Sequence, residues 1–145
     1  MLKIRETPNS ILLDTHIWIW LTNGDKKLKS PKFLDFIEEA VSSSRILVSV
    51  ISIWEVAMLE AKKRISLPYN CLEWVQRALR APGIVLAPLT PEIAVESTRL
   101  SENCHGDPAD RIILATANDQ QAALITCDQN IIKYAQEHHI KTISP

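Results

Sequence analysis

Two aspartates, Asp107 and Asp110, open a strongly apolar stretch within the segment HGDPADRIILATA, residues 105–117. Asp107 suits the N-cap of a helix, and Pro108 suits its first position, where the missing N–H costs nothing. Asp110 then falls in the first helical turn, close to the free N–H groups. The apolar run behind it predicts a helix buried on most sides. The segment therefore places carboxylates at the N-terminus of a buried helix, although an aspartate is also common at the start of any helix.

Three further carboxylates follow predicted strands elsewhere in the chain. Asp14 and Asp128 each come directly after a strand, and Glu55 falls in the first turn of a helix after another. The carboxyl ends of parallel strands and the starts of the following helices share one edge of a sheet. We therefore expect one crevice to collect four side chains: Asp14, Glu55, Asp110 and Asp128. Simple structural roles stay open, since Glu55 could close a capping box with Ser52 and Asp128 could cap the last helix.

Carboxylates crowded into one crevice repel each other, so such a cluster needs a cation. No histidine or cysteine accompanies them at ligand spacing in the sequence. An all-oxygen donor set favours Mg²⁺, with Mn²⁺ as a possible substitute, over zinc. A magnesium ion held by a few carboxylates can activate a water and neutralise a leaving oxygen. The reaction class that fits best is metal-dependent hydrolysis of a phosphodiester bond.

The elements that must position these residues alternate between strands and helices. Strands are expected at Ile11–Leu13, Arg45–Val50, Gly83–Leu86, Ala122–Cys127 and, at an edge, His139–Ile143. Helices are expected at Thr15–Leu21, Pro31–Val41, Ser52–Arg64, Pro68–Arg80, Pro91–Glu102, Asp107–Gln120 and Gln129–His138. This alternation predicts an α/β sandwich around a parallel sheet, with both faces of the sheet covered.

The apolar stripes of these helices predict which side chains face inward. Trp54, Met58 and Ala61 would share one face of their helix, and Leu72, Val75 and Leu79 a face of the next. Trp18 and Trp20 stand two residues apart, so they cannot both face inward on one short helix. One of the two is therefore a candidate for contact with a partner.

Composition limits the class of protein. We expect the 145 residues, 1–145, to form one domain, and the net charge of −1 supplies no general attraction for nucleic acid. Contacts to phosphate would need local basic clusters, which the chain has at Lys26, Lys27, Lys29 and Lys32 and at Lys62, Lys63 and Arg64. Three widely spaced cysteines without a C-x-x-C pair predict a reducing, cytoplasmic location. No segment is long and apolar enough to predict a membrane span, and the polar N-terminus does not predict a signal peptide.

Four segments together resemble the PIN-domain family, and most closely the VapC-type toxins of bacterial toxin–antitoxin pairs: LLDTHIWIWL, SVISIWEVAML, HGDPADRIILATA and LITCDQNI. The resemblance covers essentially the whole chain. It implies a three-layer α/β/α sandwich with a central, mostly parallel sheet, and a Mg²⁺-dependent endoribonuclease. It also implies an RNA substrate, a homodimer and an antitoxin that blocks the acidic crevice.

The resemblance also implies roles for individual residues. The acidic positions of the family carry over as Asp14, Glu55, Asp110 and Asp128, with Asp14, Asp110 and Asp128 as metal ligands. Glu55 would bind metal or orient the attacking water, and cleavage would leave a 5′-phosphate and a 3′-hydroxyl. Asp107 is a fifth acidic ligand, a residue behind the ligands, or only the cap. Hydroxyl groups that orient water or substrate correspond to Thr15 and Thr126. Arg111 could pair with a carboxylate or contact phosphate, and His105 could act as a ligand or a base.

Two other functions remain open from the residues alone. A phosphoacceptor signalling domain with a flavodoxin-like sheet also gathers acids around Mg²⁺, but it would want an acidic pair after the first strand and a lysine after a late one. Asp14-Thr15 and Cys127-Asp128 do not supply these groups. A catalytically inactive, RNA-binding domain of the same fold is the other alternative, and the intact acidic set argues against it.

Overall fold

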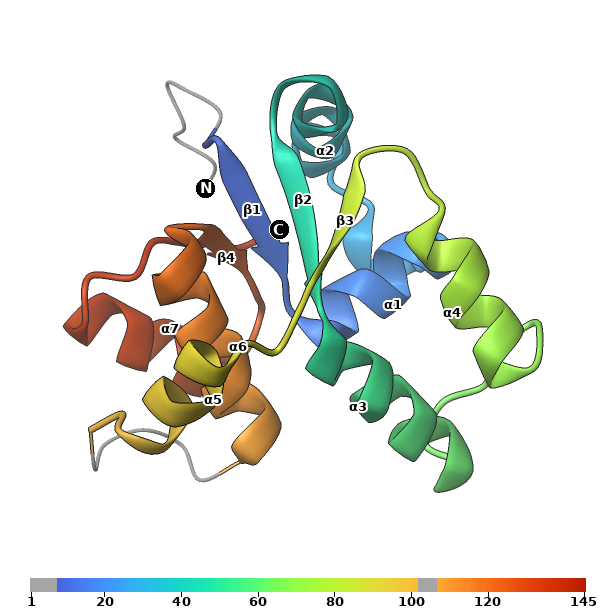
Figure 1. Ribbon diagram of the computed structural model, residues 1–145. Helices are drawn as coiled ribbons and strands as arrows, with labels where there is room; N and C mark the ends of the chain where they lie inside the picture. Colours follow the sequence, from blue (N-terminus) through green and yellow to red (C-terminus); the bar gives the residue numbers. More distant parts are fainter. Residues whose placement is uncertain (1–7, 102–106) are drawn as a thin grey trace.

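The computed structural model describes residues 8–101 and 107–145, in which five parallel strands form one sheet between two layers of helices (Figure 1). The strand order is β3-β2-β1-β4-β5, and every pairing is parallel. The strands are β1 (Ser10–Leu13), β2 (Arg45–Ser49), β3 (Ile84–Ala87), β4 (Ala123–Ile125) and β5 (Thr142–Ile143). The predicted three-layer sandwich is confirmed. Cys104 and His105 lie outside the described residues.

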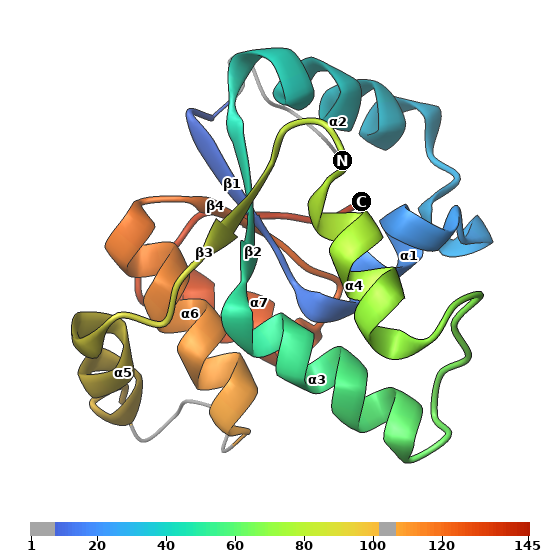
Figure 2. The same cartoon turned by 45° about the vertical axis from the view of Figure 1, so that its right-hand side comes forward.

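The helices divide between the two faces of the sheet, as both views show (Figures 1 and 2). One face carries α1 (Thr15–Asn23), the 3₁₀ helix η1 (Lys26–Leu28), α2 (Pro31–Ser43), α3 (Val50–Ala61) and α4 (Cys71–Leu79). The other carries α5 (Pro91–Thr98), α6 (Pro108–Gln120) and α7 (Gln129–Glu137). None of the helices in the described part of the chain combines the length and apolarity needed to cross a bilayer.

Successive residues of β1 point to opposite faces and so build two hydrophobic cores. Ile11 and Leu13 pack into the cluster formed with α1 to α4, whereas Leu12 packs into the cluster formed with α6 and α7. All three side chains are completely buried. The central strand is therefore apolar at every position because helices cover both of its sides.

The direction of the chain reverses at β1. From β1 it moves outward to β2 and β3, and it then returns to β4 on the other side of β1 before ending at β5. In open α/β sheets, ligands bind at the carboxyl ends of the strands where such a reversal occurs. The order also differs from the 2-1-3-4-5 order of flavodoxin-like sheets, so the predicted alternative of a flavodoxin-like phosphoacceptor domain is wrong in its fold.

Three aspartates begin helices at this edge of the sheet. Asp107 caps α6 by accepting a 2.9 Å hydrogen bond from the N–H of Ala109, with Pro108 at the first position, as predicted. Asp128 caps α7, and Asp14 caps α1 by accepting from the N–H of Thr15. The positive ends of three helices therefore point toward the carboxyl ends of the strands.

The predicted capping box of Ser52 and Glu55 is wrong. β2 ends at Ser49, and the Ser49 hydroxyl caps α3 by accepting a 3.2 Å bond from the N–H of Ile51. Ser52 therefore lies within the first turn of α3, and Glu55 lies one turn further than predicted. The inward face of α3 changes with this start: Glu55 is buried, whereas Trp54, predicted to face inward, is 58% exposed.

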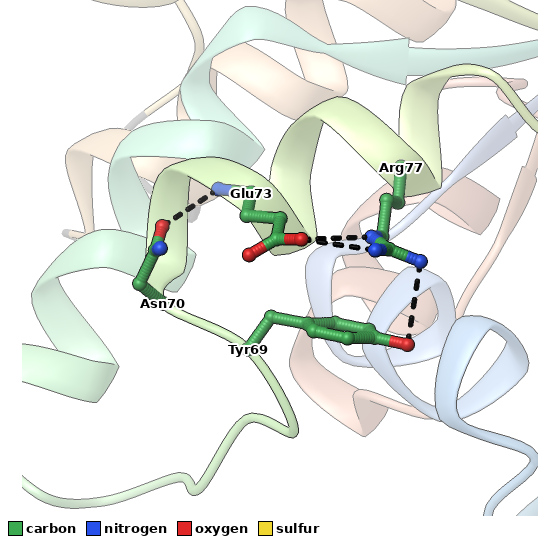
Figure 3. Close-up of polar contacts among 4 residues, drawn as sticks. All are labelled: Tyr69, Asn70, Glu73 and Arg77. Carbon is green, nitrogen blue, oxygen red and sulfur yellow. Dashed lines mark hydrogen bonds and ion pairs between the residues drawn. The ribbon is translucent and has the colours of Figure 1, made fainter.

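Helix α4 also begins later than predicted, because Asn70 rather than a residue near Pro68 caps it. The Asn70 side chain accepts a 2.9 Å bond from the N–H of Glu73 (Figure 3). Glu73 forms a 2.9 Å ion pair with Arg77, whose guanidinium carbon lies 4.1 Å from the centre of the Tyr69 ring. Leu72, predicted to face the core, is 66% exposed, and Trp74, Val75 and Ala78 are buried instead.

Candidate active site

A cavity of about 370 Å³ lies at the carboxyl ends of β1 and β4. All four carboxylates that the sequence predicted to converge line it, together with Asp107, and we call it the acidic pocket. Its lining is Asp14, His16, Ile17, Trp20, Glu55, Asp107, Asp110, Cys127 and Asp128. A larger cavity of about 610 Å³ lies between α3 and α4, but Glu60 is the one carboxylate among the described residues that line it.

Asp14 is fixed at the floor of the acidic pocket by the two central strands. Its backbone N–H donates a 3.0 Å bond to the carbonyl of Ile125 at the end of β4. Its side chain is 7% exposed and accepts 2.8 Å and 2.7 Å bonds from the N–H of Thr15 and the hydroxyl of Thr126. Burial raises the pKa of Asp14, and these two hydrogen bonds, with the nearby His16, act against that rise. Asp14 is thus held in one orientation.

Glu55 is held by a buried chain of hydroxyl groups. The Thr15 hydroxyl donates a 2.5 Å bond to Glu55 Oε1 and lies 2.8 Å from the hydroxyl of Ser52. Because Thr15 has one hydroxyl proton and gives it to the carboxylate, Ser52 must donate to Thr15. Burial raises the pKa of Glu55, the bond from Thr15 opposes this rise, and Asp14 and Asp107 add to it. Thr15 therefore contacts a carboxylate, and Ser52 supports that contact.

The surroundings of Asp110 disfavour the charged form of its carboxyl group. Its pKa is raised to about 7, first by burial and then by the other carboxylates, in the order Asp107, Asp14, Glu55 and Asp128. Near pH 7, Asp110 is therefore partly protonated unless a cation offsets this repulsion. A raised carboxyl pKa in a cavity with several like charges is a common feature of functional sites.

Thr126 joins the two sides of the pocket floor. Its hydroxyl donates to Asp14 and accepts a 3.0 Å bond from the N–H of Asp128. Asp128 Oδ1 in turn accepts from the N–H groups of Asn130 and Ile131, at 2.8 and 3.2 Å. Asp128 therefore caps α7 and lines the pocket at the same time.

Arg111 does not line the acidic pocket. Its backbone N–H donates a 3.1 Å bond to the carbonyl of Asp107, and its side chain is half-buried. The structure thus gives no support to the predicted contact between Arg111 and a phosphate in this cavity.

The donor set fits a hard divalent cation. Five carboxylates face the pocket, and desolvation together with the charge of Asp14 raises the pKa of the Cys127 thiol. Among residues 8–101 and 107–145, no three His, Cys, Asp or Glu side chains are arranged to hold a metal by themselves. Zinc requires three or four close protein ligands, whereas Mg²⁺ uses one or two carboxylates and keeps several waters. The pocket therefore suits Mg²⁺ or Mn²⁺ better than zinc.

Sequence reasoning missed four side chains of the site: His16, Trp20, Ser52 and Cys127. No histidine or cysteine was expected at ligand spacing beside the carboxylates, but His16 and Cys127 line the same pocket. The spacing of His16 and Trp20 was an available signal, because residues four apart share a helix face. Ser52 could be found only once the start of α3 was known.

Comparison with known proteins matches residues 11–137 to the PIN domain. The chain is 33% identical over 122 residues to ribonuclease VapC22 of Mycobacterium tuberculosis, covering 84% of this chain and 89% of that protein. A toxin–antitoxin complex from Klebsiella pneumoniae contains a similar chain, with 28% identity, a TM-score of 0.57, and coverage of 81% of this chain and 86% of that one. VapBC2 from Rickettsia felis, bound to a promoter DNA fragment, matches with a TM-score of 0.67 over 93% and 98% of the two chains, and its 15% identity shows the fold alone.

Proposed function

The chain belongs to the PIN-domain family, and from this premise we propose that it is a metal-dependent endoribonuclease and the toxin of a toxin–antitoxin pair. The observation that carries the proposal is the convergence of five carboxylates on one cavity, where the pKa of Asp110 rises to about 7. A site built for like charges needs a cation, and a cation beside ordered carboxylates suits phosphodiester hydrolysis. The relative named as a ribonuclease supports RNA as the substrate.

Four of the five carboxylates have a part in this proposal. Asp14, Asp110 and Asp128 would hold Mg²⁺, directly or through water. The bound ion would lower the pKa of a water and neutralise charge on the phosphate oxygens. Glu55, fixed by Thr15, orients the water for in-line attack and accepts its proton. In-line attack would break the bond between phosphorus and the 3′-oxygen, which takes a proton from solvent and leaves as the 3′-hydroxyl, so that the other product keeps a 5′-phosphate.

We propose that residues 1–145 act as one nuclease unit in the cytoplasm and that a cognate antitoxin and a second copy of the chain are its protein partners. The similar chains in toxin–antitoxin complexes support the antitoxin. Large apolar side chains exposed on α3, α4 and α5 support protein contacts more generally: Trp54, Leu72 and Val95.

An RNA cleavage assay tests the enzyme directly. We expect the purified protein to cut a long, mixed-sequence RNA with Mg²⁺ or Mn²⁺ and to stop when EDTA is added. Ligation-based sequencing of the products should report 5′-phosphate and 3′-hydroxyl ends. Wild-type protein that binds the RNA but leaves it intact under these conditions would favour the inactive RNA-binding alternative.

Substitutions show whether RNA cleavage comes from the acidic pocket or from a contaminating nuclease. Asp14→Asn and Asp110→Asn should each lower cleavage at least a hundredfold while leaving the far-UV spectrum unchanged. Asp119→Asn is the matched control, because Asp119 is exposed near the end of α6 and does not line the pocket. A double variant, Asp14→Asn with Asp110→Asn, that cut RNA at the wild-type rate would remove this pocket from consideration.

A further inference from the structure

One wall of the acidic pocket is formed by α1 and carries two aromatic rings, and Lys27 of η1 lies against one of them without lining the pocket itself. His16 and Trp20 both line the pocket, one helical turn apart, with ring centres 5.8 Å apart and planes at 56°. The Lys27 ammonium lies 4.8 Å from the centre of the Trp20 ring. We call these three residues the aromatic wall. It begins beside Asp14 and leads away from the carboxylates toward η1.

The side chains of the aromatic wall are more exposed than those of the neighbouring hydrophobic core. Trp18, two residues before Trp20, is buried and packs edge-on against Trp74 at 5.1 Å between ring centres. Trp20 is half-buried, and His16 and Lys27 are exposed. Within the described residues, Lys27 forms no ion pair, so its charge is available to a ligand.

An RNA strand carries the two kinds of group that the aromatic wall can bind, a flat base and a phosphate. The nucleotide next to a scissile phosphate carries a flat base and a further phosphate. Bases of single strands stack on tryptophan and histidine rings, and lysines contact the backbone phosphates. Bases within a duplex are already stacked and paired, so their faces cannot reach such a wall.

We propose that His16, Trp20 and Lys27 form a subsite that binds an unpaired nucleotide beside the scissile phosphate. The base stacks on the Trp20 ring, and the His16 ring, inclined at 56° to it, contacts the edge of the base. Lys27 moves from the indole to the adjoining phosphate, because an ammonium gains more from a phosphate than from an aromatic face. This inference rests on the proposed nuclease function and assigns residues that bind its substrate next to the cleaved bond.

The molecule contains an internal control for the aromatic wall. Tyr69 also lies beneath a cation, the Arg77 guanidinium at 4.1 Å (Figure 3). Tyr69 lines the cavity between α3 and α4 rather than the acidic pocket, and Arg77 is already paired with Glu73. The same ring-and-cation pair is therefore present at a place where no cluster of carboxylates accompanies it.

Binding measured without cleavage tests the subsite. The probe is a fluorescein-labelled 12-nucleotide oligouridylate, titrated by anisotropy with Mg²⁺ in an Asp110→Asn background. We expect Trp20→Leu to weaken binding about 5- to 150-fold, the range found when one stacked base loses its aromatic partner. Trp20→Phe should regain most of the affinity. His16→Ala should weaken binding several-fold, and Lys27→Ala should also reduce the salt dependence by about 0.7 in the log–log slope.

Matched controls complete the experiment. Tyr69→Ala and Arg77→Ala should stay within twofold of the parent. The duplex of the same probe with oligoadenylate should bind more weakly and should not respond to Trp20→Leu. Since His16 and Lys27 are exposed, their variants test the subsite even where Trp20→Leu fails to fold.

The outcomes distinguish the subsite from the nuclease. The subsite is overturned by parent-like affinity in His16→Ala, Lys27→Ala and the folded Trp20 variants, by no binding of the probe to the parent, or by an equal loss on the duplex. Trp20-dependent binding by a wild-type protein that cuts no RNA would support the subsite and refute the nuclease. RNA cleavage that is unaffected by the Trp20 variants would support the nuclease and refute the subsite.

Discussion

Thr126 Oγ1 donates a 2.7 Å hydrogen bond to Asp14 Oδ2, although the two residues lie 112 positions apart in the chain. The same hydroxyl accepts the N–H of Asp128. One threonine therefore ties together the two strand ends at which the chain reverses, and it fixes the carboxylate that both strands bury. Loss of this bond should affect folding and chemistry together.

We expect Thr126→Val to destabilise the protein by about 1–2 kcal/mol at pH 8, because a hydrogen bond to an ionised group is worth about 1.5–3 kcal/mol and the cavity can rehydrate in part. The bond lowers the pKa of Asp14, so its removal raises that pKa further. The loss should therefore be larger at pH 8 than at pH 5, as measured by urea unfolding. Thr126→Ser keeps the hydroxyl and should stay close to the wild type, and equal losses in both variants would contradict this account.

Stability without metal should fall as the pH rises from about 4 to about 7. Asp110 titrates near 3.8 when unfolded and near 7 when folded, so the folded state binds more protons across this window and loses that advantage as they leave. We expect Asp110→Asn, measured in EDTA, to be about 1–2 kcal/mol more stable than the wild type at pH 8, after discounting for solvent screening. No gain is expected at pH 4. A variant less stable than the wild type at pH 8 would refute the repulsion.

Mg²⁺ and Mn²⁺ should raise the melting temperature. A ligand that binds only the folded state at a hundred times its dissociation constant adds about 2.7 kcal/mol, which for a chain of this size is roughly 5–10 °C. The increase should be larger at pH 8 than at pH 6, because protons compete for Asp110. Differential scanning fluorimetry with millimolar metal measures it, with Asp119→Asn as control. Flat curves for the wild type would indicate that the acids only cap helices.

Asp107→Asn distinguishes a capping role from a ligand role. Asparagine caps helices as well as aspartate does, so stability should change by about 0.5 kcal/mol or less. The charge of Asp107 raises the pKa values of Asp110 and Glu55, so its removal lowers both and should move the acidic limb of the pH–rate profile to lower pH. A hundredfold loss of cleavage at every pH would instead make Asp107 a metal ligand.

The start of α6 could be predicted because its determinants are local. Asp107, Pro108 and Asp110 act within one turn, and each occupies the place that its chemistry requires. The sheet was similarly accessible, since buried parallel strands are apolar at every position. Which strands are neighbours was not, because strand order depends on packing between distant segments.

The start of α3 shows why other parts could not be predicted. Ser49 and Ser52 both suit a cap, and only the pairing of β2 with its neighbours decides that the strand ends at Ser49. The helix therefore starts three residues earlier than predicted, and Trp54, which was predicted to face inward, lies on its exposed face. Likewise, spacing alone shows that one of Trp18 and Trp20 faces outward, but Trp74 of α4 decides which.

The carboxylates of the acidic pocket belong to neither hydrophobic cluster, and they lie where the direction of the chain reverses. Asp110 contributes repulsion rather than cohesion, so neutralising it leaves the interior of the protein intact. A catalytically inactive variant should accordingly stay folded and bind the same partners as the active protein. In a cell that makes both, the variant should compete for these partners and weaken the effect of the active protein.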